Sequence, residues 1–278
     1  MRIFDFNMHF TKLGAVENPH MVSDETRMRY KDLTYCFEEH IDLFKENVTA
    51  GNFMLFNQNI FALEKDVAPF FKQVRQTLPG SCFTALFDFR RPDISKILDK
   101  AADQGLSGLK FHSYFQKITE TDYTAALAIA RQAEKRGMFI CIDTSFGTSG
   151  MYRYDNMKFA CAVADEVSCP VILLHSGGLR ALEAMLLAQE KSHVYLETSF
   201  SLHFYKGSTI EKDILFAYKK LGPGKLIYAS DYPYVGLEES LSTAAAGFEK
   251  CGFSDKNMAD IFYYNAQKLL QNPQRFIQ

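Results

Sequence analysis

The chain has 278 residues, of which 47% are hydrophobic and 23% charged, and its formal net charge is -2 at neutral pH. A chain of this length and composition forms one large domain or two smaller ones, and it is too apolar to be intrinsically disordered. The small charge, with no stripe of Lys and Arg, excludes the electrostatic surface that nucleic acids and anionic membranes require.

The cysteines and the start of the chain indicate a cytoplasmic protein. The six cysteines are scattered and form no C-x-x-C pair, so they predict reduced thiols rather than a zinc knuckle or a redox motif. Residues 1–10 do not have the pattern of a signal peptide, and no apolar run reaches the ~18 residues of a membrane span. We expect a small-molecule substrate, no nucleic-acid or membrane partner, and a chain that can pair as a homodimer.

Short β-rich runs recur along the chain, with helical patterns between them. Most begin about 25–30 residues apart, which is the length of a strand, a helix and two short loops. Such a rhythm is typical of parallel strands joined by helices. The eight expected strands begin near Arg2, Asn52, Cys82, Ser107, Met138, Pro170, His193 and Lys225.

Between these strands, apolar residues at helical spacing predict helices over Asp93–Gln104, Thr121–Arg136 and Leu179–Lys191. His9 to Thr26 is expected to form a long loop over one end of the fold, and Asp255–Leu270 an extra C-terminal helix.

The eight alternations predict an α/β fold, a single-domain (β/α)₈ TIM barrel over residues 1–278. The alternative, a doubly wound sheet, would carry a Gly-rich phosphate turn after its first strand, and the sequence has none.

Polar side chains gather at the carboxyl ends of the expected strands, where barrel enzymes hold their active sites. Alternation along the first strand places Asp5, Asn7 and His9 on one face. One polar strand end is commonly a cap or an interior polar layer, whereas six are hard to explain by solvation alone. The other five are Lys110-Phe111-His112, Asp143-Thr144-Ser145, His175-Ser176-Gly177-Gly178, Glu197-Thr198-Ser199 and Ser230-Asp231-Tyr232-Pro233.

These segments together resemble the amidohydrolase superfamily, specifically its amidohydrolase family 2 branch of metal-dependent TIM-barrel hydrolases and decarboxylases. The resemblance covers nearly the whole chain, and although each pattern is weak alone, their order and spacing make a strong match. The segments are IFDFNMHF, GLKFHSY, PVILLHSGG, VYLETS, KLIYASDYPY and YYNAQKLL.

The resemblance implies a metal site in which imidazoles and a carboxylate hold a divalent ion with an open water position. The family carries His-x-His on the first strand, His at the ends of the fifth and sixth, and Asp on the eighth. Here His9, His175 and Asp231 match, whereas Asn7 replaces the first His and Asp143 the fifth-strand His. The expected ion is Zn²⁺, with Mn²⁺ or Mg²⁺ favoured by the added oxygen ligands, and a site without metal is the alternative.

The expected catalytic residues are Asp231, as the base that activates water, and His175 beside it. Their structural alternatives are a turn cap before Pro233 and a hydrogen-bonded core histidine. Asn7 either ligates the ion or bonds the loops, and Asp143 is either a ligand or a hydrogen-bond acceptor at the rim of the barrel.

Three residues are expected to contact substrate. Lys110 and His112 alternate onto one face of the fourth strand. Other branches of the superfamily carbamylate a fourth-strand lysine, but that requires the missing His pair, so an unmodified Lys110 either binds a substrate carboxylate or forms a structural ion pair. Arg90 follows the third strand and offers a bidentate carboxylate contact, with a solvated loop as its alternative.

Three functions remain open at this point. The first is hydrolysis of a lactone, amide or related bond in a small carboxylated substrate. The second is non-oxidative decarboxylation of an aromatic or enoic acid on the same fold. The third is an inactive ligand-binding barrel, suggested by Asn7 and Asp143, which predicts neither a metal nor turnover.

Overall fold

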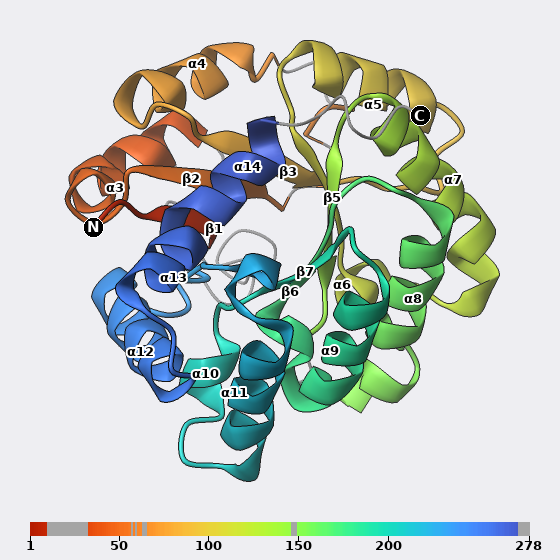
Figure 1. Cartoon of the computed structure of the whole chain (residues 1–278). Helices are drawn as coiled ribbons and strands as arrows, with labels where there is room; N and C mark the ends of the chain where they lie inside the picture. The colour runs from red at the N-terminus through yellow and green to blue at the C-terminus, as the bar shows by residue number, and fades with distance from the viewer. Residues whose placement is uncertain (10–32, 57, 59, 63–65, 146–148, 272–278) are drawn as a thin grey trace.

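The computed structural model describes residues 1–9, 33–56, 58, 60–62, 66–145 and 149–271. Within them, eight parallel strands pair in chain order, and helices surround the strands (Figure 1). The predicted (β/α)₈ barrel and its eight strands are therefore confirmed. The strands are β1 (Phe4–Met8), β2 (Ala50–Leu55), β3 (Cys82–Leu86), β4 (Gly108–Phe111), β5 (Phe139–Asp143), β6 (Val171–Leu174), β7 (Val194–Glu197) and β8 (Leu226–Ile227).

The expected helices are confirmed, with ends shifted by one or two residues. Of the long loop predicted from His9 to Thr26, only His9 lies within the described residues. The helices are α3 (Leu33–Asn47), α4 (Ala68–Thr77), α5 (Ile94–Asp103), α6 (Ser113–Gln116), α7 (Tyr123–Lys135), α8 (Asn156–Glu166), α9 (Ala181–Glu190), α10 (Ser201–Phe204), α11 (Thr209–Leu221), α12 (Leu237–Lys250), α13 (Asp255–Ala259) and α14 (Asn265–Gln271), with a π-helical turn over Asp260–Tyr264 between the last two.

The barrel closes between β1 and the segment that follows β8. Asp231 N donates to Asn7 O at 2.9 Å, and His9 N donates to Tyr232 O at 2.7 Å. These backbone bonds bring Asn7 and Asp231, which are 224 positions apart in the sequence, into direct contact. The closure thus builds one part of the strand-end site from the first strand and the segment that follows the last strand.

Strict alternation does not hold along β1. Phe4 and Phe6 pack in the apolar cluster inside the barrel, whereas Met8 packs with the cluster between strands and helices. The register against β2 shifts between Asp5 and Met8, and such an irregularity re-aims the side chains that follow it. Simple alternation, from which we expected Asp5, Asn7 and His9 to share one face, therefore does not describe the whole of β1.

Phenylalanine supplies much of the outer core, which accounts for the 25 Phe residues of the chain. Phe71 of α4 stacks on Phe83 of β3 with ring centroids 3.7 Å apart. On the inner side, Gly108 of β4 leaves room for neighbouring strands, because a Cβ there would run into the Phe139 ring and lie 2.5 Å from Thr84 Oγ1.

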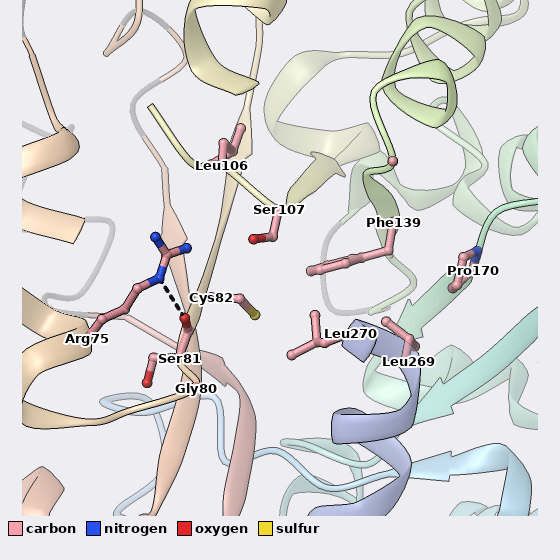
Figure 2. A pocket seen from close by; sticks show the side chains of 11 residues that line it. Arg75, Gly80, Ser81, Cys82, Leu106, Ser107, Phe139, Pro170, Leu269 and Leu270 are labelled. Atoms are coloured by element: carbon pink, nitrogen blue, oxygen red, sulfur yellow. Dashed lines mark hydrogen bonds between the residues drawn. The ribbon is translucent and has the colours of Figure 1, made fainter. Parts of the chain in front are cut away.

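The extra C-terminal helix covers the N-terminal end of the barrel. Asn265 Nδ2 donates to Leu226 O at 2.8 Å, which ties α14 to β8. Beside α14, Leu269 and Leu270 line a cavity of about 310 Å³ with residues from the starts of several strands, Cys82 and Phe139 among them (Figure 2). This cavity lies at the end of the barrel opposite the polar strand ends.

None of the helices among the described residues is long and apolar enough to cross a membrane.

Candidate active site

Seven of the eight expected site residues meet at the carboxyl ends of the strands. They are buried, with exposed fractions of 8% or less except for the partly buried His112. Their side chains form two neighbouring groups, one where β1 meets β8 and one across β4, β5 and β6. The seven residues are Asn7, His9, Lys110, His112, Asp143, His175 and Asp231.

The first group holds the Asp231 carboxylate by one oxygen. Asn7 Nδ2 donates to Asp231 Oδ1 at 3.1 Å, and His9 Nε2 lies 3.4 Å from the same oxygen. The structure records no partner for Oδ2 among the described residues. Asp231 also has a φ of +63°, a conformation that is rare for a residue with a side chain. A strained backbone conformation persists only where the surrounding structure fixes it, and such residues cluster at functional sites.

The second group places one carboxylate between two imidazoles. Asp143 Oδ2 lies 3.3 Å from His175 Nε2 and 3.5 Å from His112 Nε2. Its other oxygen accepts hydrogen bonds from the backbone N and the hydroxyl of Ser145, at 3.1 and 2.6 Å. Asp143 is therefore fully engaged within the protein, as a rim acceptor and ion-pair partner.

The two imidazoles of this group differ in charge. Burial lowers the pKa of His175, but Asp143 and other carboxylates outweigh this effect and raise it from 6.5 to about 9, so His175 is an imidazolium at neutral pH. Burial dominates at His112 and lowers its pKa to about 4. Burial opposes ionisation of Asp143 as well, yet His112, His175 and Lys110 hold its pKa well below the usual range.

Sequence reasoning assigned no role to Ser199 or Glu197, which orient His175. Ser199 Oγ lies 3.0 Å from His175 Nδ1 and donates to Glu197 Oε2 at 2.9 Å. Glu197 Oε2 also accepts from the backbone N of His175 at 3.1 Å. Burial raises the pKa of Glu197. In the sequence, the only sign of a role for these two residues is that they lie at a polar strand end.

Lys110 lies within this set, whereas Arg90 is occupied elsewhere. The Lys110 ammonium sits over the Phe56 ring, 4.6 Å from its centroid. Arg90 forms an ion pair with Asp122 at 2.9 Å and donates to Gln116 O at 3.0 Å. A substrate carboxylate would have to displace these contacts, so Lys110 is the better placed cation for it.

The donor set does not fit the zinc site that the family resemblance implies. Among the described residues, no three His, Cys, Asp or Glu side chains are arranged to hold a metal ion. His175 Nε2, an atom that would bind the ion, lies against Asp143 Oδ2. Asn7 turns its N–H toward Asp231, while its Oδ1 is buried and has no hydrogen-bond partner among the described residues. His9, Asp143 and His175 thus contact carboxylates or imidazoles of the same set, whereas the Asn7 oxygen does not.

Beneath the site lies a buried carboxyl group, Asp5. Its Oδ1 accepts from Ser230 N at 2.9 Å and from Asn7 N at 3.2 Å, and its Oδ2 has no partner within the described structure. Burial raises the pKa of Asp5 from 3.8 to about 7. Asp5 therefore links β1 to the segment that follows β8 through hydrogen bonds, while the burial of its carboxylate is electrostatically unfavourable.

Comparison with known proteins gives one family match and several similar structures. The family model described as amidohydrolase matches residues 78–271. No curated protein sequence matches the chain.

The similar structures share the fold. A probable 2-pyrone-4,6-dicarboxylic acid hydrolase from Acinetobacter baumannii is 17% identical with a TM-score of 0.65, covering 98% of this chain and 100% of its own. A 2,6-dihydroxybenzoate decarboxylase is 12% identical with a TM-score of 0.66, covering 98% and 100%. A dihydroorotase from Campylobacter jejuni is 14% identical with a TM-score of 0.62, covering 97% and 83%.

Proposed function

We propose that this chain, which belongs to the amidohydrolase family, is a hydrolase that opens a lactone, amide or related bond in a small carboxylated substrate. The observation that carries the proposal is the Asp231 carboxylate, held through Oδ1 by Asn7 and His9 and with no recorded partner for Oδ2 among the described residues. A carboxylate held in this way is suited to take a proton from water. Family members and structural neighbours include hydrolases, which agrees with this chemistry.

In the proposed reaction Asp231 acts as general base. Oδ2 accepts a proton as the water oxygen bonds to the carbonyl carbon, and the C=O electron pair moves to the carbonyl oxygen. When the tetrahedral intermediate collapses, the C–O or C–N bond breaks and the proton passes from Asp231 to the leaving group. A positioned base of this kind contributes about 100-fold to 10,000-fold to a rate.

His9, Asn7 and His175 would orient the reacting groups. His9 and Asn7 hold Asp231 Oδ1, which fixes the direction of the other oxygen. In the second group of side chains, His175 forms an ion pair with Asp143, and Ser199 holds the His175 ring. These charges therefore have fixed positions beside the first group. Groups that do not reorganise during reaction stabilise developing charge better than mobile ones.

These steps use only side chains of this chain. Relatives in the family generally use divalent metals, but among the described residues no three His, Cys, Asp or Glu side chains are arranged to hold one. The expectation of Zn²⁺, Mn²⁺ or Mg²⁺ therefore stays a prediction from the resemblance, and elemental analysis of protein purified without chelator checks it.

Decarboxylation is the second candidate. The observation that favours it is the His175 imidazolium held by Asp143, since such an acid can deliver a proton to carbon as carbon dioxide leaves. One neighbouring structure is a decarboxylase.

The product distinguishes the two candidates. The protein is incubated with a panel of carboxylated lactones and amides that includes 2-pyrone-4,6-dicarboxylate, and separately with 2,6-dihydroxybenzoate, in water enriched in heavy oxygen. The proposal predicts a ring-opened or cleaved product that carries heavy oxygen from water. Release of carbon dioxide together with an organic product that carries no solvent oxygen, or no cleavage across the whole panel, would overturn it.

A further inference from the structure

We propose that Lys110, held over the ring of Phe56, forms an anion subsite that binds an oxyanion of the substrate. This inference rests on the proposed function and names the charged group that the site recognises. The oxyanion is either a carboxylate of the bound substrate or the oxygen that becomes negative during water attack, and both have the same chemistry.

The first observation is the isolation of the Lys110 ammonium. Lys110 is 1% exposed, and within the described parts of the chain the structure records neither a hydrogen bond nor an ion pair for its Nζ. Its one recorded contact is the face of the Phe56 ring, 4.6 Å from the centroid. A buried charge without a hydrogen-bonding partner is costly, so proteins rarely retain one without a use for it.

The second observation is an unsatisfied polar atom close by. His112, which directly follows β4, has a buried Nδ1 with no hydrogen-bond partner among the described residues; because its Nε2 lies 3.5 Å from Asp143 Oδ2, Nδ1 is the acceptor nitrogen of the neutral ring. Its ring packs edge to face on Phe56, with centroids 5.7 Å apart. Lys110 and His112 therefore both border the same aromatic ring, where Lys110 leaves donors unused for an anion and His112 leaves an acceptor unused for an O–H or N–H group of the same ligand.

The position of this subsite is suited to the reaction. Phe56 also contacts His9, with ring centroids 5.4 Å apart, and His9 lies 3.4 Å from Asp231. One aromatic side chain thus connects the cation to the group that holds the proposed base.

The alternative, a structural ion pair, predicts a carboxylate on Lys110. Asp143, the acidic candidate on the neighbouring strand β5, gives its oxygens to His112, His175 and Ser145 instead. The charge of Lys110 still acts on Asp143 and helps to lower its pKa, but the hydrogen-bonding positions of the ammonium are left for a ligand.

The first test measures binding of benzoate and of benzamide, which have similar shape but differ in charge, by titration calorimetry. Acetate serves as a smaller carboxylate. We expect wild-type protein to bind a carboxylate at least about tenfold more tightly than benzamide, and Lys110→Met to lose about 30-fold or more of that affinity. Lys158→Met, which removes a surface lysine paired with Glu120, is expected to change nothing. Carboxylate affinity unchanged by Lys110→Met, or no carboxylate binding by wild type, would overturn the proposal.

The second test uses stability, because a structural lysine and a ligand-binding lysine predict opposite results. Methionine replaces the buried ammonium by an apolar group of similar length, so Lys110→Met is expected to unfold at a higher temperature than wild type without ligand. Added carboxylate is expected to raise the melting temperature of wild type but not of the variant. A variant that melts below wild type, or does not fold, shows that Lys110 is structural and refutes the inference.

Kinetics on a hydrolysed substrate separate the two sources of the oxyanion. If Lys110 binds a substrate carboxylate, Lys110→Met mainly raises KM, and if it stabilises the transition-state oxygen, it mainly lowers kcat. Hydrolysis with both constants unchanged would refute the subsite while the proposed hydrolase stands. Carboxylate binding that depends on Lys110, in a protein that hydrolyses nothing, would refute the hydrolase while the subsite stands.

Discussion

Replacing Asp5 by asparagine should stabilise the protein, and the gain should depend on pH. Asp5 is fully buried, and its Oδ1 accepts two backbone hydrogen bonds that an amide oxygen can also accept. Its Oδ2 has no partner among the described residues, so the ionised form is poorly satisfied. Asparagine keeps the acceptor and removes the buried charge.

The magnitude follows from the pKa of Asp5, which burial raises from 3.8 to about 7. Because the folded state binds this proton more tightly than the unfolded state, wild-type stability falls as pH rises from 3.8 to about 7 and then levels off. A rise of about 3 in a pKa corresponds to roughly 4 kcal/mol. The asparagine side chain cannot ionise, so the Asp5→Asn variant should lack this loss.

Urea denaturation at about pH 5 and about pH 8 measures the effect, and the stability advantage of Asp5→Asn should grow by about 2–3 kcal/mol between them. Asp165→Asn, on the exposed surface of α8, controls for the removal of one negative charge. An advantage that does not change with pH, or a variant less stable than wild type at the higher pH, would refute the argument that Asp5 is a buried, costly carboxyl.

Two further predictions concern positioning and packing. Ser199→Ala removes the hydroxyl between His175 and Glu197 and should cost about 1–3 kcal/mol in urea denaturation; unchanged stability would show that this contact does not hold His175. Gly108→Ala drives a Cβ into the Phe139 ring and should cost about 1–3 kcal/mol, whereas an unchanged melting temperature would mean that the strands move apart freely.

The sequence predicts the barrel because strand rhythm and helical spacing are local properties. It also predicts where polar groups gather, since the carboxyl ends of parallel strands meet at one end of the fold. The polar residues after β4, β5 and β6 could be placed together on this basis alone, and Lys110, His112, Asp143 and His175 are found there.

Which of those residues contact one another could not be predicted in the same way. Whether Asp143 faces a metal or two imidazoles depends on the distances between strands, which no local pattern contains. The irregularity in β1 between Asp5 and Met8 changes which side chains face inward, and alternation gives no warning of it. The isolation of Lys110 is visible only when every neighbouring strand is in place.

The proposed hydrolysis depends most directly on Asp231 as the base that activates water. On any compound that wild-type protein hydrolyses, Asp231→Asn should reduce kcat by about 100-fold to 10,000-fold while circular dichroism and the melting temperature show a folded protein. Asp165→Asn should retain full activity. A folded Asp231→Asn variant whose kcat stays within about threefold of wild type would contradict this role, because a base worth so little could not be the group that takes the proton.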